Sequence, residues 1–455
     1  MKRTLAEFAQ ACGGLLRGSD RGFSGVCSDT RTLKRGELFV ALRGPHFNAN
    51  EFVSAAQSAG AAGAVVDSEQ SVGISQIVVQ DTQAALERGG HAWRSQFSIP
   101  LVGVAGSNGK TTAKEMTSTI LSQAGSCLAT RGNLNNHIGV PLTLLRIEPT
   151  DRFAVIEMGA NRAGEVAALV RIARPTVGLI TNAGAEHLEG FGSLAGVARA
   201  EGEMVEGLAK DATAVINADD EFAGLWRKMT AARVVTFGIR APADFGASDI
   251  RTAIGADGFV TRFTLSGPAG RAAVELQMGG RHNVSNALAA AASASAAGAT
   301  LQHIVTGLAA VRGVPGRLQF KKAASGAWLI DDSYNANPSS VRAGIEVLAD
   351  LEGRRWLVLG DMAELGEYAQ SAHEQIGVFA RERGIERLYA MGPLAALAVE
   401  SFGAGATWFA DPAALAQALG SAPADVRMLI KGSRVNRLER VVDALVGTTH
   451  TTGGS

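Results

Sequence analysis

The chain has 455 residues, enough for about three domains of typical size, and its 46% hydrophobic content is ample for sizeable cores. A formal net charge of +0 gives no overall attraction to nucleic acid or to an anionic membrane, so any anionic ligand must be held by a local site. The three cysteines lack metal-ligand spacing, which favours a reducing, cytoplasmic location. The alanine-rich run 287–299 is interrupted by serines, which favours a close-packed helix over a membrane span.

Residues 1–97 are predicted to form a first α/β domain. The N-terminal segment places its apolar residues at helical spacing, which favours an amphipathic helix over a signal peptide. Strands are expected at 37–42, 64–67 and 77–80, followed by a helix at 82–97. A compact polar set could hold a sugar or a diphosphate, although a capped turn explains it better on the residues alone. This set consists of Ser28, Asp29, Thr30 and Arg31.

The next stretch, from Ile99 to Thr112, carries the strongest signal in the chain. The apolar run 101–105 predicts a buried parallel strand, and the residues after 110 have the periodicity of a helix. Backbone N–H groups of a glycine-rich loop at such a junction bind phosphate oxygens, while Lys110 can reach the β- and γ-phosphates and Thr111 can ligate Mg²⁺. Val104 stands where the standard spacing has a glycine, so the match is not strict. The loop residues are Gly106, Ser107, Asn108, Gly109, Lys110, Thr111 and Thr112.

Residues 98–312 are predicted to form a central domain with a parallel sheet. Its further strands are expected at 153–159, 177–184, 212–217 and 233–237, and period-two alternation at 259–265 and 271–278 predicts an added antiparallel hairpin. Because ligands collect at the carboxyl ends of parallel strands, Glu157 and His187 are expected near Lys110. A carboxylate inside an apolar run favours a metal ligand at Glu157. His187 is equally compatible with a structural loop residue.

Residues 313–455 follow a glycine- and proline-rich linker and are predicted to form a Rossmann-like parallel sheet. Five strands are expected, at 328–332, 355–360, 387–391, 407–410 and 427–431. The run 331–337 offers carboxylates, amides and an aromatic ring at a strand end. Lys431 to Arg434 suit either an anion site or a charged surface turn. Lys110 and Arg317, on different domains, favour an ATP-dependent group-transfer enzyme that closes over its substrate.

Eight motifs together resemble the Mur ligase family over nearly the whole chain. The family's phosphate loop has the spacing seen here, with no glycine at position 104. The run Asp-Ser-Tyr-Asn-Ala-Asn-Pro is similar to that of the members that add D-alanyl-D-alanine, and the Asp-Asn-Pro-Arg signature of the neighbouring ligases is absent. The motifs lie at 106–112, 132–141, 157–161, 185–193, 280–283, 331–338, 359–366 and 431–434.

The resemblance implies a three-domain α/β fold and an ATP- and Mg²⁺-dependent amide ligase of cytoplasmic peptidoglycan precursor synthesis. ATP would phosphorylate the terminal carboxylate of UDP-N-acetylmuramoyl-tripeptide, and the amine of D-alanyl-D-alanine would attack the acyl phosphate. Either diaminopimelate or lysine is compatible with the third position of that peptide. We further expect a monomer with no nucleic-acid or membrane partner.

Residue roles are also implied by the resemblance. Lys110 would neutralise the transferring phosphate, and Thr111, Glu157 and His187 would hold Mg²⁺. ATP would be bound by the loop and by Asn283, Arg317 and Asp332, with Asn335 close by. The UDP part would contact Ser28, Asp29, Thr30 and Arg31. The dipeptide would meet Asp361, Lys431 and Ser433.

One departure from the family concerns the second metal site. Members commonly carry a carbamoylated lysine in the helix after the metal-site histidine, and this chain has Glu201 at that place. A carbamate is a carboxylate on a longer arm, so we hypothesise that Glu201 ligates the second Mg²⁺ directly. At 48–50 the chain reads Asn-Ala-Asn where relatives often have an acidic residue and a histidine, which leaves the contacts there open.

Two other classes compete with this interpretation. A folylpolyglutamate synthase-like or cyanophycin synthetase-like amide ligase would share the central domain, but the UDP-type first domain argues against both. A mechanical or regulatory P-loop NTPase needs no acceptor domain and predicts nucleotide hydrolysis without an amino acceptor.

Overall fold

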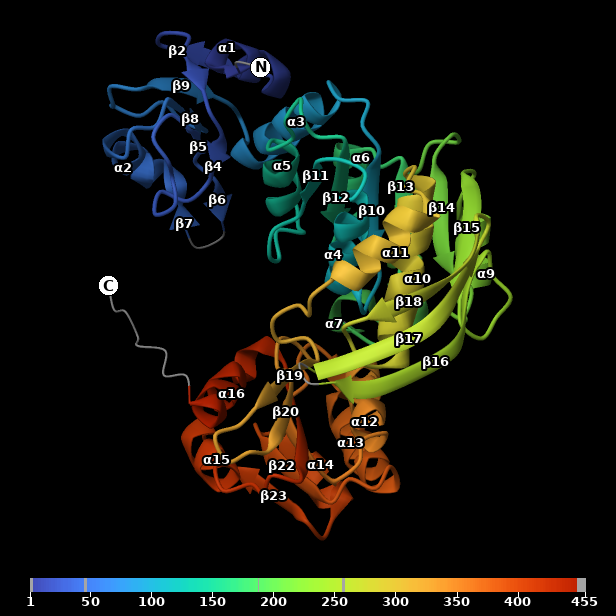
Figure 1. The fold of residues 1–455 in the computed structure, drawn as a ribbon. Helices are drawn as coiled ribbons and strands as arrows, with labels where there is room; N and C mark the ends of the chain where they lie inside the picture. Colours follow the sequence, from blue (N-terminus) through green and yellow to red (C-terminus); the bar gives the residue numbers. More distant parts are fainter. Residues whose placement is uncertain (1–2, 45–46, 187, 256–257, 448–455) are drawn as a thin grey trace.

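The computed structural model describes residues 3–44, 47–186, 188–255 and 258–447. Three α/β regions follow one another along the chain, and each is built on its own sheet (Figure 1). In the described part of the chain, no helix is long and apolar enough to cross a membrane.

The N-terminal region has a five-stranded sheet in which β2 is antiparallel and the other strands are parallel. The predicted N-terminal helix is confirmed as α1 (Leu5–Cys12), which begins with a capping box between Thr4 and Glu7. The sheet strands are β2 (Leu15–Arg17), β9 (Ser75–Val78), β8 (Gly63–Val66), β5 (Leu38–Val40) and β4 (Val26–Cys27). The other elements are β1 (Arg3–Thr4), β3 (Gly22–Phe23), β6 (Arg43–Gly44), β7 (Phe47–Asn48), η1 (Ala49–Phe52), α2 (Val53–Ser58) and α3 (Thr82–Arg94).

The central region has a nine-stranded sheet whose first part is parallel and whose last three strands are antiparallel. The predicted hairpin is confirmed as β17 and β18, but the long strand β16 beside it was not expected. Its outer half is exposed and lacks the alternation that marks a strand. In sheet order the strands are β11 (Cys127–Ala129), β12 (Phe153–Glu157), β10 (Leu101–Ala105), β13 (Val177–Ile180), β14 (Thr213–Asn217), β15 (Arg233–Gly238), β16 (Phe245–Gly255), β17 (Gly258–Gly267) and β18 (Gly270–Leu276).

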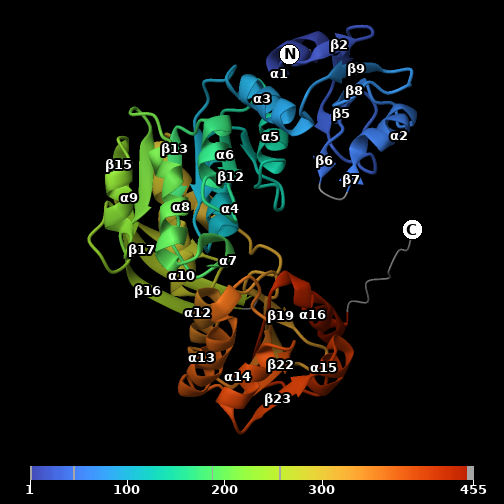
Figure 2. The ribbon, with the colours of Figure 1, turned by 180° about the vertical axis from the view of Figure 1, so that it is seen from behind.

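Successive residues of β10 enter different cores, because side chains alternate across a strand. Val102 and Val104 pack toward the face covered by α4 (Lys110–Leu121), α10 (Arg281–Ala296) and α11 (Leu301–Ala310) (Figure 1). Leu101 and Ala105 pack toward the face covered by α6 (Glu165–Ala173) and α8 (Leu194–Glu206) (Figure 2). The remaining helices are α5 (Gly139–Leu144), α7 (Leu188–Phe191) and α9 (Ala223–Met229).

The second of these cores continues into the N-terminal region. Leu5 and Phe8 of α1 belong to the same apolar cluster as Leu101 of the central sheet. Trp93 of α3 belongs to the same cluster and donates a hydrogen bond from Nε1 to Ile147 O at 3.0 Å. The N-terminal and central regions therefore share one hydrophobic core.

The C-terminal region has a six-stranded sheet in which the five predicted strands are confirmed. The edge strand β19 was not predicted, because it directly follows the linker and is only half-buried. In sheet order the strands are β19 (Gln319–Lys322), β20 (Trp328–Asp332), β24 (Val426–Lys431), β21 (Arg354–Gly360), β22 (Arg387–Met391) and β23 (Ala406–Phe409). The helices are α12 (Pro338–Ala349), α13 (Ala369–Glu382), α14 (Ala395–Phe402), α15 (Pro412–Leu419) and α16 (Glu439–Val446), with short turns η2 (Gly366–Tyr368) and η3 (Arg434–Asn436).

An apolar contact joins the central hairpin to the C-terminal region. Phe259 of β17 is buried in the C-terminal core, where its ring meets that of Phe320 at 5.0 Å. Phe320 in turn stacks on Trp328 of β20 at 4.6 Å. Strand β17 of the hairpin thus packs against the edge strand β19 of the C-terminal sheet.

Candidate active site

The loop from Gly106 to Gly109 leaves β10 and opens α4. Gly106 has a φ of +119°, and a Cβ there would lie 2.1 Å from the Thr181 hydroxyl oxygen, so no other residue fits this position. Asn182 fixes the loop by accepting from the backbone N–H groups of Ser107 at 2.9 Å and of Asn108 at 3.0 Å. No side chain caps α4, so its first N–H groups are available to an anion.

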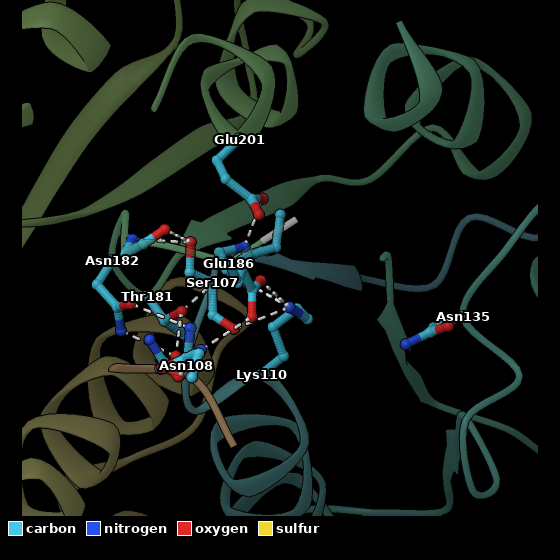
Figure 3. A network of polar contacts seen from close by, with 12 residues as sticks. Ser107, Asn108, Lys110, Asn135, Thr181, Asn182, Glu186 and Glu201 are labelled. Carbon is cyan, nitrogen blue, oxygen red and sulfur yellow. Dashed lines mark hydrogen bonds and ion pairs between the residues drawn. The ribbon is translucent and has the colours of Figure 1, made fainter. Parts of the chain in front are cut away.

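Lys110 lies over this loop (Figure 3). Its Nζ donates to Gly106 O at 2.6 Å and to Ser107 O at 3.0 Å, and it pairs with Glu186 Oε1 at 3.1 Å. Burial by itself lowers the pKa of Lys110, but the carboxylates of Glu186, Glu201 and Glu157 outweigh burial and raise that pKa above its ordinary value. The lysine is therefore fully charged at neutral pH.

Glu186 is a functional candidate that the sequence did not reveal. It is 9% exposed, and its Oε2 accepts from Asn337 Nδ2 of the C-terminal region at 3.3 Å. The predicted metal ligand next to it, His187, lies outside the described residues. The sequence places Glu186 shortly after a predicted strand, which was the available signal. It does not show whether Glu186 or His187 faces the phosphate loop.

Glu201 points from α8 toward the start of the loop (Figure 3). Its Oε2 accepts from the Gly106 N–H at 2.6 Å, and the residue is 3% exposed. Burial raises the pKa of Glu201 to about 7, against the opposing effect of the Lys110 charge. The structure thus brings Glu201 to the phosphate loop.

Glu157 ends β12 inside the same site. Its Oε1 accepts from Asn135 Nδ2 at 2.8 Å, while its buried Oε2 has no hydrogen-bond partner among the described residues. A cavity of about 360 Å³, here called the phosphate cavity, is lined by Glu157, Lys110 and Thr111. A buried carboxylate oxygen without a donor suits a hard cation that prefers oxygen ligands. Within the described ranges, which omit residue 187, no group of three or more His, Cys, Asp or Glu residues could hold a metal.

The C-terminal region contacts the phosphate loop directly. Asn108 donates from Nδ2 to the Ser339 hydroxyl at 2.9 Å and accepts from Asn337 Nδ2 at 2.8 Å. Arg317 reaches the Thr111 hydroxyl at 3.5 Å, and its guanidinium lies 4.5 Å from the ring centre of Tyr334. Lys110 and Arg317, which were predicted to act at one site between two domains, both line the phosphate cavity.

A second cavity, of about 320 Å³, lies on the other side of this contact. Asn283 lines it and is held by a hydrogen bond from its Nδ2 to Gly279 O at 2.8 Å. Asp332 lines it as well and pairs with Lys431 Nζ at 2.7 Å. Lys431 also donates to Asn335 O at 2.8 Å, and burial lowers the pKa of this lysine below its ordinary value. Thr112 completes the wall toward α4.

The remaining predicted residues lie apart from the phosphate cavity or are engaged within the fold. Asp361 Oδ1 accepts from the Ala395 N–H at 2.7 Å. The Ser433 hydroxyl accepts from the Ala363 N–H at 2.8 Å and donates to Ala336 O at 3.2 Å. Both side chains hold C-terminal loops together.

The polar set at 28–31 lies in the N-terminal region, after β4. Arg31 pairs with Asp29 at 2.7 Å, and its hydrogen bonds lower the pKa of that carboxyl to about 2. The Arg31 side chain is 87% exposed, so it remains available to a ligand. Ser28 and Thr30 belong to the same turn.

Comparison with known families matches two regions of the chain. Residues 104–294 match the Mur ligase middle domain, and residues 316–434 match the Mur ligase, glutamate ligase domain. These matches cover more than half of the chain. The chain belongs to the Mur ligase family.

Relatives within the Mur ligases align over nearly the full length. The UDP-N-acetylmuramoyl-tripeptide–D-alanyl-D-alanine ligase of Escherichia coli is 44% identical over 448 residues, covering 97% of this chain and 98% of its own. The enzyme of the same name from Bacillus subtilis is 34% identical over 88% of this chain and 87% of its own.

Solved structures of Mur ligases share the fold. A crystal structure of MurF from Acinetobacter baumannii superposes with a TM-score of 0.92 at 33% identity, covering 98% of this chain and 99% of that one. MurF from Thermotoga maritima in complex with ADP gives 0.82 at 26% identity, covering 93% and 97%. The expected three-domain α/β fold, with a central nucleotide-binding sheet and a C-terminal sheet, is confirmed.

Proposed function

We propose that this Mur ligase joins D-alanyl-D-alanine to UDP-N-acetylmuramoyl-tripeptide, with conversion of ATP to ADP and phosphate, in cytoplasmic peptidoglycan precursor synthesis. The observation that carries the proposal is the contact of Asn108 with Asn337 and Ser339. It brings the phosphate loop against the C-terminal region and leaves cavities at their junction. The 44% identity to the Escherichia coli enzyme supports the same assignment.

In this proposal, each of the three regions binds a different substrate group. Residues 1–97 bind the UDP part through Ser28, Asp29, Thr30 and Arg31. Residues 98–312 carry the phosphate loop, and residues 313–455 receive the dipeptide. Of the three C-terminal candidates, Ser433 lines the cavity between the central and C-terminal regions, Lys431 lines the phosphate cavity and the second cavity, and Asp361 binds the backbone of an adjacent loop. We expect the protein to act as a monomer.

ATP would bridge the two regions. The loop residues 106–112 would bind its phosphates, with Arg317 and Asn335 on the opposite wall of the phosphate cavity. The nucleoside part fits the second cavity beside Asn283 and Asp332. Lys110 would neutralise charge on the transferring phosphoryl group, because electrostatic stabilisation dominates catalysis of phosphoryl transfer.

Activation is needed because a carboxylate is a poor electrophile. The terminal carboxylate of the tripeptide attacks the γ-phosphorus, ADP leaves, and an acyl phosphate forms. The amine nitrogen of the dipeptide then bonds to the carboxyl carbon, the carbon–oxygen bond to phosphate breaks, and phosphate departs with the electron pair.

Magnesium fits the donors present at the phosphate cavity. Thr111, Glu157 and His187 would hold Mg²⁺, and Glu201 would ligate a second ion. Bound Mg²⁺ supplies charge neutralisation at the phosphate oxygens. If Glu201 ligates Mg²⁺ in place of a carbamoylated lysine, ligase activity should be independent of added bicarbonate. The Glu201→Ala variant should lose most of that activity. Strong bicarbonate stimulation of the unmodified enzyme would contradict the role of Glu201.

One experiment separates the candidate functions. Purified protein is mixed with ATP, Mg²⁺ and UDP-N-acetylmuramoyl-tripeptide, and phosphate release is measured with and without D-alanyl-D-alanine. A ligase requires the dipeptide for sustained release. Release that is indifferent to the dipeptide would defeat the proposed function and favour a hydrolytic NTPase.

A further inference from the structure

A third cavity, of about 690 Å³ and here called the interdomain cavity, adjoins the phosphate cavity. The two cavities share part of their walls, so a molecule in one can touch a molecule in the other. Of the described residues that line both, Glu186 alone carries a carboxylate. The shared residues are Asn133, Glu186, Tyr334, Asn335, Ala336 and Asn337.

The Glu186 carboxylate is held in place from both sides. Oε1 is 3.1 Å from Lys110 Nζ, and Oε2 is 3.3 Å from Asn337 Nδ2. A carboxylate offers about four acceptor positions, so each oxygen can accept another hydrogen bond. Because the side chain is 11% exposed and lines both cavities, the free positions are accessible from these cavities.

The charges around the interdomain cavity suit a ligand with an amino group. Lys321 is neutralised by Asp331 at 2.7 Å, and Arg434 by Glu439 at 3.3 Å. Glu439 Oε2 is buried and has no partner among the described residues. Among the carboxylates that line the interdomain cavity, Glu186 contacts the phosphate loop directly, through Lys110.

We propose that Glu186 accepts a hydrogen bond from the amine of the acceptor and holds that nitrogen against the acyl phosphate formed beside Lys110. This inference deepens the proposed function and rests on it. The nitrogen–carbon bond forms and the carbon–oxygen bond to phosphate breaks, and one proton of the amine leaves with the phosphate as hydrogen phosphate. Glu186 thereby couples the site of activation to the site of amine binding.

The test compares two nucleophiles in Glu186→Gln. Hydroxylamine is small, needs no anchoring group, and traps the acyl phosphate as a hydroxamate without the dipeptide. Hydroxamate formation from ATP and UDP-N-acetylmuramoyl-tripeptide measures activation alone, so it corrects for any effect of the substitution on Lys110. The ratio of dipeptide ligation to hydroxamate formation should fall at least about tenfold, the loss typical of a charge-assisted hydrogen bond, with a raised KM for the dipeptide.

A parallel fall of both products, leaving the ratio unchanged, would overturn the proposal, because Glu186 would then act on Lys110 alone. Glu189→Gln is the matched control, since it removes an exposed carboxylate from the same segment. If Glu186→Gln does not fold, Glu186→Asp is read by the same ratio. Failure of the proposed function would be recognised by a different result: the unmodified enzyme would release phosphate at the same rate with and without the dipeptide.

Discussion

Two lysines stand at the carboxyl ends of parallel strands in two sheets, Lys431 buried and Lys110 largely buried, yet their surroundings differ. Lys110 of the central region faces the carboxylates of Glu186, Glu201 and Glu157, which raise its pKa despite burial. Lys431 of the C-terminal region faces one carboxylate, Asp332, and burial lowers its pKa. The difference shows that the neighbouring carboxylates, and not the position at a sheet edge, decide the direction in which the pKa of such a lysine shifts.

This difference separates a binding role from a supporting one. Lys110 can exchange a carboxylate for a phosphate and stay charged, because other carboxylates remain near it. Lys431 has one acidic partner, so losing it would leave a buried charge without compensation. We therefore expect substitutions at the two positions to affect different measurements.

The largest effect is expected for Lys110→Met. Removing the charge that faces the transferring phosphoryl group should lower kcat of dipeptide-dependent phosphate release by about 10³-fold or more. Lys210→Met, which removes an exposed lysine elsewhere in the central region, serves as the control and should leave kcat unchanged. A loss below about tenfold at Lys110 would remove the distinction between the two lysines.

The second effect is on stability. Lys431→Met leaves Asp332 buried without a counter-ion and should lower the free energy of unfolding of the C-terminal region by about 3 kcal/mol. Adding Asp332→Asn removes the unpaired charge and should restore most of that loss. Urea unfolding of the single and double variants measures both. Equal stability of the single and double variants would contradict a cost of the unpaired Asp332 charge.

A smaller effect is expected at the contact between the two regions. Asn337→Ala removes hydrogen bonds to Asn108 and Glu186 as well as the N-cap of α12, and should reduce ligation about tenfold. Ser339→Ala spares that cap and should cost about threefold. Steady-state kinetics with varied ATP distinguishes the two. Similar losses of ligation in the two variants would indicate that the hydrogen bonds to Asn108, and not the one to Glu186, account for the effect.

The smallest effect concerns pH. Burial lowers the pKa of His282, beside the Lys431–Asp332 pair, to about 4. The unfolded imidazole takes up a proton near pH 6.5 while the folded one stays neutral, so stability is full above that pH and falls as the pH drops toward 4. Between pH 8 and 6 the loss should be about 0.8 kcal/mol, and His282→Asn should abolish it. An NMR titration of the His282 ring near pH 6.5 would contradict this.

Local patterns in the sequence were sufficient for most of the fold. The run from Gly106 to Thr112 predicts a phosphate loop, because the geometry of such a loop depends on residues that are neighbours in the sequence. The buried strands are predicted by their apolar runs. β16 and β19 were missed because their exposed or half-buried residues carry no such pattern. A strand at a sheet edge is defined by its partner, which lies elsewhere in the chain.

The site could be predicted in part for the same reason. Lys110, Glu157 and Arg317 lie at the predicted junction, but the roles of Glu186 and Asn337 depend on a contact between two domains. Asp361 and Ser433 stand at strand ends as predicted, yet their side chains bind backbone groups of adjacent loops. Sequence position indicates which edge a polar residue occupies, and not whether the fold itself already uses its hydrogen bonds.

The insertion of Phe259 into the C-terminal core has a mechanical consequence. Its contact with Phe320 is apolar, whereas the contacts of Asn108 and Arg317 with the opposite region are polar. Separating the two regions at Asn108 would break hydrogen bonds that water can replace, whereas separating them at Phe259 would expose aromatic rings to water. The C-terminal region is thus joined to the central region by one apolar contact and several polar ones, whereas the N-terminal and central regions share a continuous core.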